Sequence, residues 1–79
     1  MTTSLDQLPV GATAKVERLQ GGFGFQQHVQ DLGLKVGQVL RKVQQTGTSP
    51  ILIEFESQTV AVGRGIARRI LVDESSNGD

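Results

Sequence analysis

The stretch "ILIEFESQTVAV", residues 51–62, holds two short runs of alternating apolar residues on either side of a polar turn. Ile51, Ile53 and Phe55 share one side of the first run, and Val60 and Val62 share one side of the second. A period of two is typical of a strand that buries one face. Because only "ESQ" separates the runs, the sequence predicts a tight β-hairpin here.

Three further strands are predicted on both sides of this hairpin, at residues 12–19, 38–45 and 70–72. A single helical turn is expected in "GRGIAR", before the last strand. Five short strands favour a mainly all-β fold. We expect a small, partly open barrel, because closing a small sheet into a barrel protects the edges of its strands. The expected core-facing residues of the three strands are Ala12, Ala14, Val16, Val39, Val43, Ile70 and Val72.

A long excursion, "QGGFGFQQHVQDLGLKVG", separates the first two predicted strands. A helix over residues 25–32 would place Phe25, Val29 and Leu32 on one face. Phe23 stands between glycines, so it either caps the core or forms an exposed contact. The glycines before the helix lack the remaining residues of a phosphate-binding motif, which makes a mobile loop the favoured interpretation.

Two glycines follow this helix and have a backbone explanation. Gly33 stands where helices often end in a left-handed residue, and Leu34 would then pack back against Val29. Gly37 fits the third position of a type II turn, where a positive φ is required. The sequence therefore predicts structural roles for Gly33 and Gly37.

Composition excludes several classes of protein. The chain has 79 residues, no cysteine and a net charge of zero, which predicts one small domain without disulfides or thiolate metal sites. Residues 1–72 carry 8 bases and 5 acids, an excess too small to indicate nucleic-acid binding. No segment approaches a membrane span or a signal peptide. We expect residues 1–73 to form the domain and the polar residues 74–79 to be a disordered tail.

Little in the sequence points to catalysis or to a resident metal. His28 is the only histidine, and no nucleophile or orienting partner is marked out beside it, so no enzyme activity is predicted. Gln26, Gln27 and Asp31 do not complete a metal site around it, although a transient or intermolecular site stays open. A mildly basic face is expected from Arg41, Lys42, Arg64, Arg68 and Arg69, suited to an acidic partner surface.

The chain resembles the FeoA family of ferrous iron transport accessory proteins over about residues 4–73. The most specific matches are "DLGLKVGQVL" with Gly33 and Gly37, the strand "PILIE", and the closing "ILV". The resemblance implies an SH3-like β-barrel, a fold also found at the C-terminus of iron-dependent repressors. Departures from the family pattern are Gln26, Gln27 and His28 where arginines are common, Val36 in place of proline, and Ser57 in place of glycine.

What the resemblance implies is a cytoplasmic, non-enzymatic protein that binds and regulates FeoB, a membrane ferrous iron transporter. No cofactor, no nucleic acid and no insertion into the membrane are expected, and homo-oligomers are left open. Two alternatives also remain: a metal-responsive regulatory domain, and a self-associating barrel with pairing edge strands. The residues expected to contact the partner are Phe23, Gln27, His28, Leu32, Leu34 and Arg64.

Overall fold

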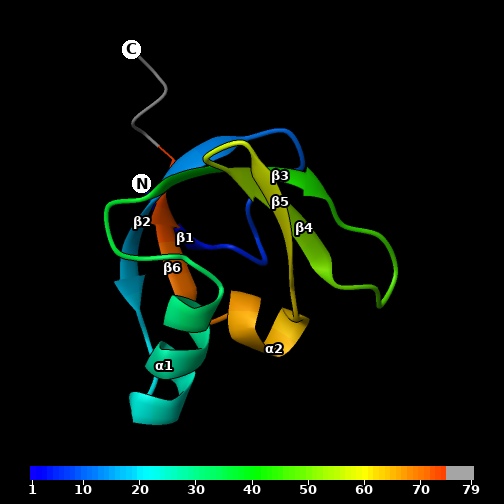
Figure 1. The fold of residues 1–79 in the computed structure, drawn as a ribbon. Helices are drawn as coiled ribbons and strands as arrows, with labels where there is room; N and C mark the ends of the chain where they lie inside the picture. The colour runs from blue at the N-terminus through cyan, green and yellow to red at the C-terminus, as the bar shows by residue number, and fades with distance from the viewer. Residues whose placement is uncertain (75–79) are drawn as a thin grey trace.

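The structure is a computed structural model, and it describes residues 1–74. One sheet carries two helices at the end away from the N-terminus (Figure 1). Neither helix in this part of the chain is long and apolar enough to cross a membrane. The elements in chain order are β1 (Thr2–Ser4), β2 (Thr13–Leu19), α1 (Phe23–Asp31), β3 (Val39–Gln44), β4 (Ile51–Phe55), β5 (Gln58–Val62), α2 (Arg64–Ala67) and β6 (Ile70–Asp73).

The six strands form one sheet in the order β1-β6-β2-β3-β4-β5, and every pair is antiparallel. All five predicted strands are present, which confirms the mainly β architecture. Strand β1 is an addition of three residues, too short to show alternation in the sequence. Register shifts in the β2–β6 and β3–β4 pairs bend the sheet, as bulges do. Apart from Glu74, the predicted tail lies outside the described residues.

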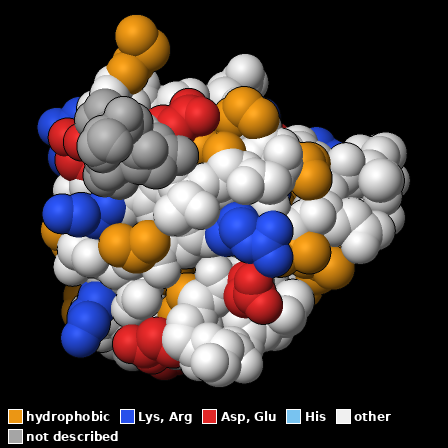
Figure 2. Space-filling view, turned by 90° about the horizontal axis from the view of Figure 1, so that it is seen from above, with side chains coloured by type: hydrophobic (Ala, Val, Ile, Leu, Met, Phe, Trp, Pro, Cys, Tyr) orange, Lys and Arg blue, Asp and Glu red, His pale blue; other side chains and the backbone are white. Residues whose placement is uncertain are grey.

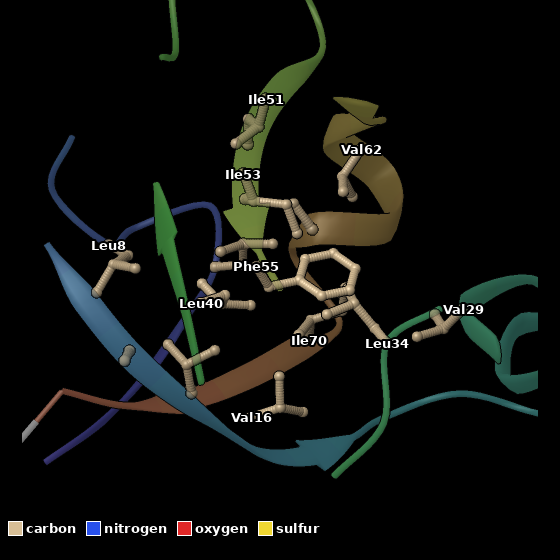
Figure 3. Close-up of a cluster of buried hydrophobic side chains, with 14 of the residues drawn as sticks. Leu8, Val16, Val29, Leu34, Leu40, Ile51, Ile53, Phe55, Val62 and Ile70 are labelled. Atoms are coloured by element: carbon tan, nitrogen blue, oxygen red, sulfur yellow. The ribbon is translucent and has the colours of Figure 1, made fainter. Parts of the chain in front are cut away.

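A single hydrophobic core fills the inside of the bent sheet (Figure 3). Strand β4 buries Ile51, Ile53 and Phe55, as its alternation predicted. Two further core residues, Leu5 and Leu8, come from the connection between β1 and β2 and are at most 1% exposed. The sequence analysis missed them because this connection is an irregular turn without strand or helix periodicity.

The predicted orientation of β3 is wrong. Val39 is 48% exposed and Val43 is half-buried, whereas Leu40 and Lys42 face the core. The sequence favoured the opposite orientation, because Val39 and Val43 are apolar and a lysine is usually exposed to solvent. In the structure Lys42 faces inward because its ammonium group finds hydrogen-bond partners inside the barrel.

Lys42 is fully buried, and its ammonium lies in a polar cluster. Nζ donates to the backbone carbonyl of Asp6 at 3.1 Å and also to the side-chain carbonyl of Gln45. The Gln45 amide in turn donates to the Asp6 carboxylate at 3.4 Å, and the Arg64 guanidinium lies 3.8 Å from that carboxylate. These contacts tie the β1–β2 connection to β3 and to α2.

Burial lowers the pKa of Lys42 below its ordinary value of 10.5, the nearby Asp6 carboxylate opposes the shift, and Arg64 adds to it. Between the lowered and the ordinary value the unfolded chain binds more protons than the folded one, so this group makes stability rise with pH. We therefore expect wild-type protein to gain stability relative to Lys42→Met as the pH rises towards 10.5, the ordinary pKa of lysine. Urea unfolding followed by circular dichroism across this range measures the difference.

Lys35→Met, at an exposed lysine, is the matched control for the loss of one positive charge. The prediction would be contradicted if the free energy of unfolding of wild type, relative to that of Lys42→Met, stayed constant or fell as the pH rises.

The β4–β5 hairpin turns through two non-glycine residues in a left-handed conformation. Glu56 has φ +51° and Ser57 has φ +66°, and Phe55 pairs with Gln58 across the turn. Two successive residues with positive φ define a type I′ turn, which favours Asn-Gly because side chains such as glutamate and serine are strained there. The predicted tight hairpin is thus present, with unfavourable turn residues.

We expect the double change Glu56→Asn with Ser57→Gly to raise the free energy of unfolding by about 1–2 kcal/mol. In a domain of this size each kcal/mol corresponds to roughly 4–8 °C in Tm. Thermal unfolding measures the gain. Ser49→Gly, in a loop position without positive φ, is the control and should give no gain. A lower Tm for the double variant would show that the turn is not strained.

Candidate functional site

Helix α1 is held to the barrel by its buried face and by its C-terminus. Phe25 and Val29 are its buried residues. Gly33 has φ +94° and donates to the carbonyl of Gln30 at 2.9 Å, while Leu34 donates to the carbonyl of Val29 at 3.2 Å. These two bonds form a Schellman motif, and Leu34 packs beside Val29 in the core (Figure 3). The helix stop predicted from the sequence is therefore present.

The turn after this motif returns the chain to the barrel. Gln38 donates to the carbonyl of Lys35 at 3.0 Å, and Gly37 at the third position has φ +96°, as predicted for a type II turn. The amide of Gly37 donates to the carbonyl of Val16 at 2.8 Å, and the amide of Val16 donates to Gln38 at the same distance. The base of the excursion is therefore fastened to β2.

At the start of α1, Gly21 solves a problem of space. A Cβ placed on Gly21 would lie 2.3 Å from Cδ2 and 2.5 Å from Cγ of Phe25, whereas a Cβ on Gly22 or Gly24 would meet nothing within 4 Å. Only the first of these glycines is required for packing. The helix starts at Phe23, two residues before the predicted start, and Gly22 is its N-cap in an extended conformation.

The outer face of α1 carries the exposed candidate residues. The side chain of Phe23 is 84% exposed although it is a large apolar group in an ordered helix. Gln27 and His28 are exposed on the same helix, and Gln27 donates to the Asp31 carboxylate at 3.3 Å. Phe23 is thus exposed and does not cap the core, which was one of the two interpretations of this residue.

Arginines lie beside this end of the molecule. Arg69 places its guanidinium 6.0 Å from the centre of the Phe25 ring, and its carbonyl accepts from the amide of Gln20 at 2.8 Å. Arg18, Arg68 and Arg69 are exposed, and no carboxylate pairs with them among residues 1–74. The α1 end therefore combines an exposed aromatic side chain with arginines that have no carboxylate partner in the described part of the chain.

The other residues of the predicted basic face have different surroundings. Lys42 is buried, and Arg41 pairs with Glu54 at 2.9 Å. Arg64 donates through Nε to the carbonyl of Ser49 at 3.2 Å and through Nη2 to the carbonyl of Gly47. Arg64 thus fastens the β3–β4 loop to α2, and of the predicted basic face only Arg68 and Arg69 remain available.

The two leucines of the predicted contact set differ in exposure. Leu34 is 1% exposed, so it supports α1 from below and offers no surface to a partner. Leu32 is half-buried at the C-terminus of the helix and packs against the core. The exposed part of the candidate site consists of Phe23, Gln27 and His28.

A metal site is not assembled around His28. Within the described part of the chain, no three His, Cys, Asp or Glu side chains lie together in a way that could hold an ion. The arrangement around α1 can bind a surface through aromatic, amide and cationic groups.

The face of the molecule seen from above in Figure 2 differs from the α1 end. Lysine, arginine and acidic side chains alternate there with small groups of apolar ones, and no single kind of side chain forms a continuous patch. α1 lies at the opposite end in Figure 1, so the face shown in Figure 2 is the one turned away from this helix.

A family model described as the FeoA domain matches residues 3–74. The chain belongs to the FeoA domain family. The match runs from β1 to just beyond β6, so it includes α1 and both glycine turns. Nearly all of the described chain is therefore one FeoA domain.

Individual proteins agree with this assignment. The putative Fe(2+) transport protein A of Methanocaldococcus jannaschii is 29% identical over 68 residues, which are 86% of this chain and 82% of that protein. A crystal structure described as an iron uptake regulatory protein (FeoA) superimposes with a TM-score of 0.87 at 26% identity, covering 92% of this chain and 97% of the other.

The same fold occurs in a longer protein of another kind. A manganese-dependent transcriptional repressor matches 92% of this FeoA chain with a TM-score of 0.85 at 21% identity, but only 41% of the repressor is covered. The likeness confirms the predicted SH3-like fold and its relation to repressor domains.

Proposed function

We propose that the protein is an accessory component of ferrous iron uptake on the cytoplasmic side of the membrane, where its α1 end binds and regulates a FeoB-type transporter. The observation that carries the proposal is the exposed Phe23 on an ordered helix, at the end of the molecule where Arg68 and Arg69 have no carboxylate partner among residues 1–74. Membership of the FeoA domain family supports the role in iron transport. The protein acts by binding and carries out no reaction of its own.

The chemistry of this surface indicates what it binds. An aromatic side chain can enter an apolar pocket as an anchor, and arginines on the rim attract acidic groups and speed association. Gln27 and His28 add hydrogen-bonding groups beside the anchor. The surface therefore suits an acidic patch with an apolar depression on the cytoplasmic part of the transporter.

Binding of the transporter's purified cytoplasmic domain, measured by calorimetry with GTP-analogue and GDP forms, tests the proposal. We expect Phe23→Ala to weaken binding about 10- to 100-fold, the range of an interface anchor. Adding Arg68→Glu and Arg69→Glu to this variant should weaken binding further and reduce the dependence of binding on salt. Val36→Ala, at an exposed valine in the turn after α1, is the matched control.

Equal affinity of the Phe23→Ala variant and wild type would reject the α1 end as the binding surface. Binding that is absent in wild type, in either nucleotide state, would reject the cytoplasmic domain as the partner. Iron uptake by cells that carry each variant would then show whether the membrane part of the transporter is contacted instead.

A second candidate function is a metal-responsive regulatory domain, which the structural likeness to a manganese-dependent repressor favours. His28 and Asp31 are exposed on α1 and could contribute two ligands to an ion completed by another molecule. Titration of the labelled protein with Fe²⁺ and Mn²⁺ tests this candidate. Amide resonances of residues 27–32 that do not move in either titration would exclude it.

A further inference from the structure

Strand β5 is an open edge of the sheet. It pairs with β4 only, because the order β1-β6-β2-β3-β4-β5 places it last. Gln58, Thr59 and Ala61 are exposed, and Val60 is partly buried against the core. A strand in this position presents unpaired backbone groups to any extended chain that comes alongside.

The register of the hairpin shows which backbone groups point outward. Phe55 and Gln58 close a two-residue turn and form a hydrogen-bonded pair, and such pairs alternate along an antiparallel ladder. Val60 and Val62 therefore direct their N–H and C=O groups towards β4. Thr59 and Ala61 direct theirs away from the sheet.

Charge and proline, two of the usual devices that protect an edge, are missing from β5. Its sequence, QTVAV, contains neither a charge nor a proline. The opposite edge is better protected, because β1 has only three residues and the N-terminal ammonium beside it pairs with Asp73 at 3.0 Å. Of the two edges, β5 is the one open to pairing.

We propose that β5 pairs with β5 of a second copy of this chain, antiparallel, about a two-fold axis beside Val60. In this register Thr59 of each copy lies opposite Ala61 of the other. These are the residues with outward backbone groups, so the pairing forms about four hydrogen bonds between the chains. The two Val60 side chains meet on the core side and cover apolar surface that is partly exposed in one copy.

The sequence of β5 suits itself as a partner. Small and β-branched side chains face one another at the Thr59–Ala61 and Val60–Val60 positions, and no like charges are brought together. The contact is small, so the dimer forms reversibly and depends on concentration. It leaves α1 free, and the inference therefore stands apart from the proposed binding of a transporter.

Sedimentation equilibrium of the full chain, from micromolar to millimolar concentration, tests the pairing. We expect the average mass of wild type to rise from that of one chain towards that of two. The variant Thr59→Lys with Ala61→Lys brings two lysines together at both pairs and should weaken association at least about 10-fold.

A charge-swapped variant tests the register itself. Thr59→Lys with Ala61→Glu places a lysine opposite a glutamate at both pairs, so association should return and weaken with added salt. Both variants change only exposed side chains, and circular dichroism checks that they are folded. Amide exchange should show protection of Thr59 and Ala61 only at high concentration.

Wild type that keeps the mass of one chain at every concentration would overturn the inference and leave this edge for an extended segment of a different protein. Association that is unchanged in the double-lysine variant, or that fails to return in the charge-swapped variant, would overturn it as well.

Discussion

Leu34→Ala is expected to lower the free energy of unfolding by about 2–5 kcal/mol. Leu34 is 1% exposed and packs in the core beside Val29, so its loss leaves a cavity under the end of α1. Small domains are stable by only about 5–15 kcal/mol, which makes this a large part of the total. The chain has no tryptophan or tyrosine, so urea unfolding is followed by far-ultraviolet circular dichroism.

Leu52→Ala is the matched control, because Leu52 is half-buried on the other face of β4 and its truncation removes less buried surface. Amide exchange of α1 provides a second measurement, since Leu34 also completes the Schellman motif. An equal loss of unfolding free energy in both variants would show that Leu34 contributes no more to stability than a half-buried leucine does.

Gly21→Ala is expected to destabilise the protein by about 1–3 kcal/mol or more, as other overpacked sites do. The new methyl group would overlap the near end of the Phe25 side chain, with Cγ only 2.5 Å away, so the helix must shift or the ring must leave its place. Gly24→Ala should have the opposite sign and gain up to about 1 kcal/mol, because the space around it is open and alanine favours a helix. Thermal unfolding of both variants measures the contrast.

A double-mutant cycle identifies the cause. With Phe25→Ala in the background, Gly21→Ala should cost less, because Cδ2 and Cγ, the two nearest atoms, have been removed and only Cβ, at 2.8 Å, remains. A cost that is the same in both backgrounds would place the effect in the backbone of the loop.

The sequence predicted the parts of the fold whose signals are local. The alternation of Ile51, Ile53 and Phe55 marks a strand and its buried face, and "DLGL" marks the end of a helix through Gly33. Each of these signals depends on a few neighbouring residues and on backbone preferences that tertiary contacts reinforce.

The errors concern features that depend on contacts between residues far apart in the sequence. Lys42 faces inward because Asp6 and Gln45 satisfy its ammonium, and that arrangement depends on a residue 36 positions away. Leu5 is buried by a connection without periodicity. No pattern within β3 or the first ten residues carries this information.

The candidate site was predicted in part. Phe23 was recognised as ambiguous, and its exposure could be decided only by the position of the helix start. Arg64 and Leu34 lie in the sequence beside plausible contact residues, but the structure uses one to hold loop carbonyls and the other to fill the core. Arg18 was missed because its position opposite Leu71 depends on the pairing of β2 with β6, two strands that are far apart in the sequence and adjacent in the sheet.

Helix α1 contributes Phe25 and Val29 to the same core as the strands, and the base of its excursion is bonded to Val16. The helix cannot detach without exposing core side chains, so its order is obtained when the barrel folds. A partner that contacts the outer face of α1 therefore meets a surface already fixed in its binding shape, and association does not have to supply the entropy of forming a helix.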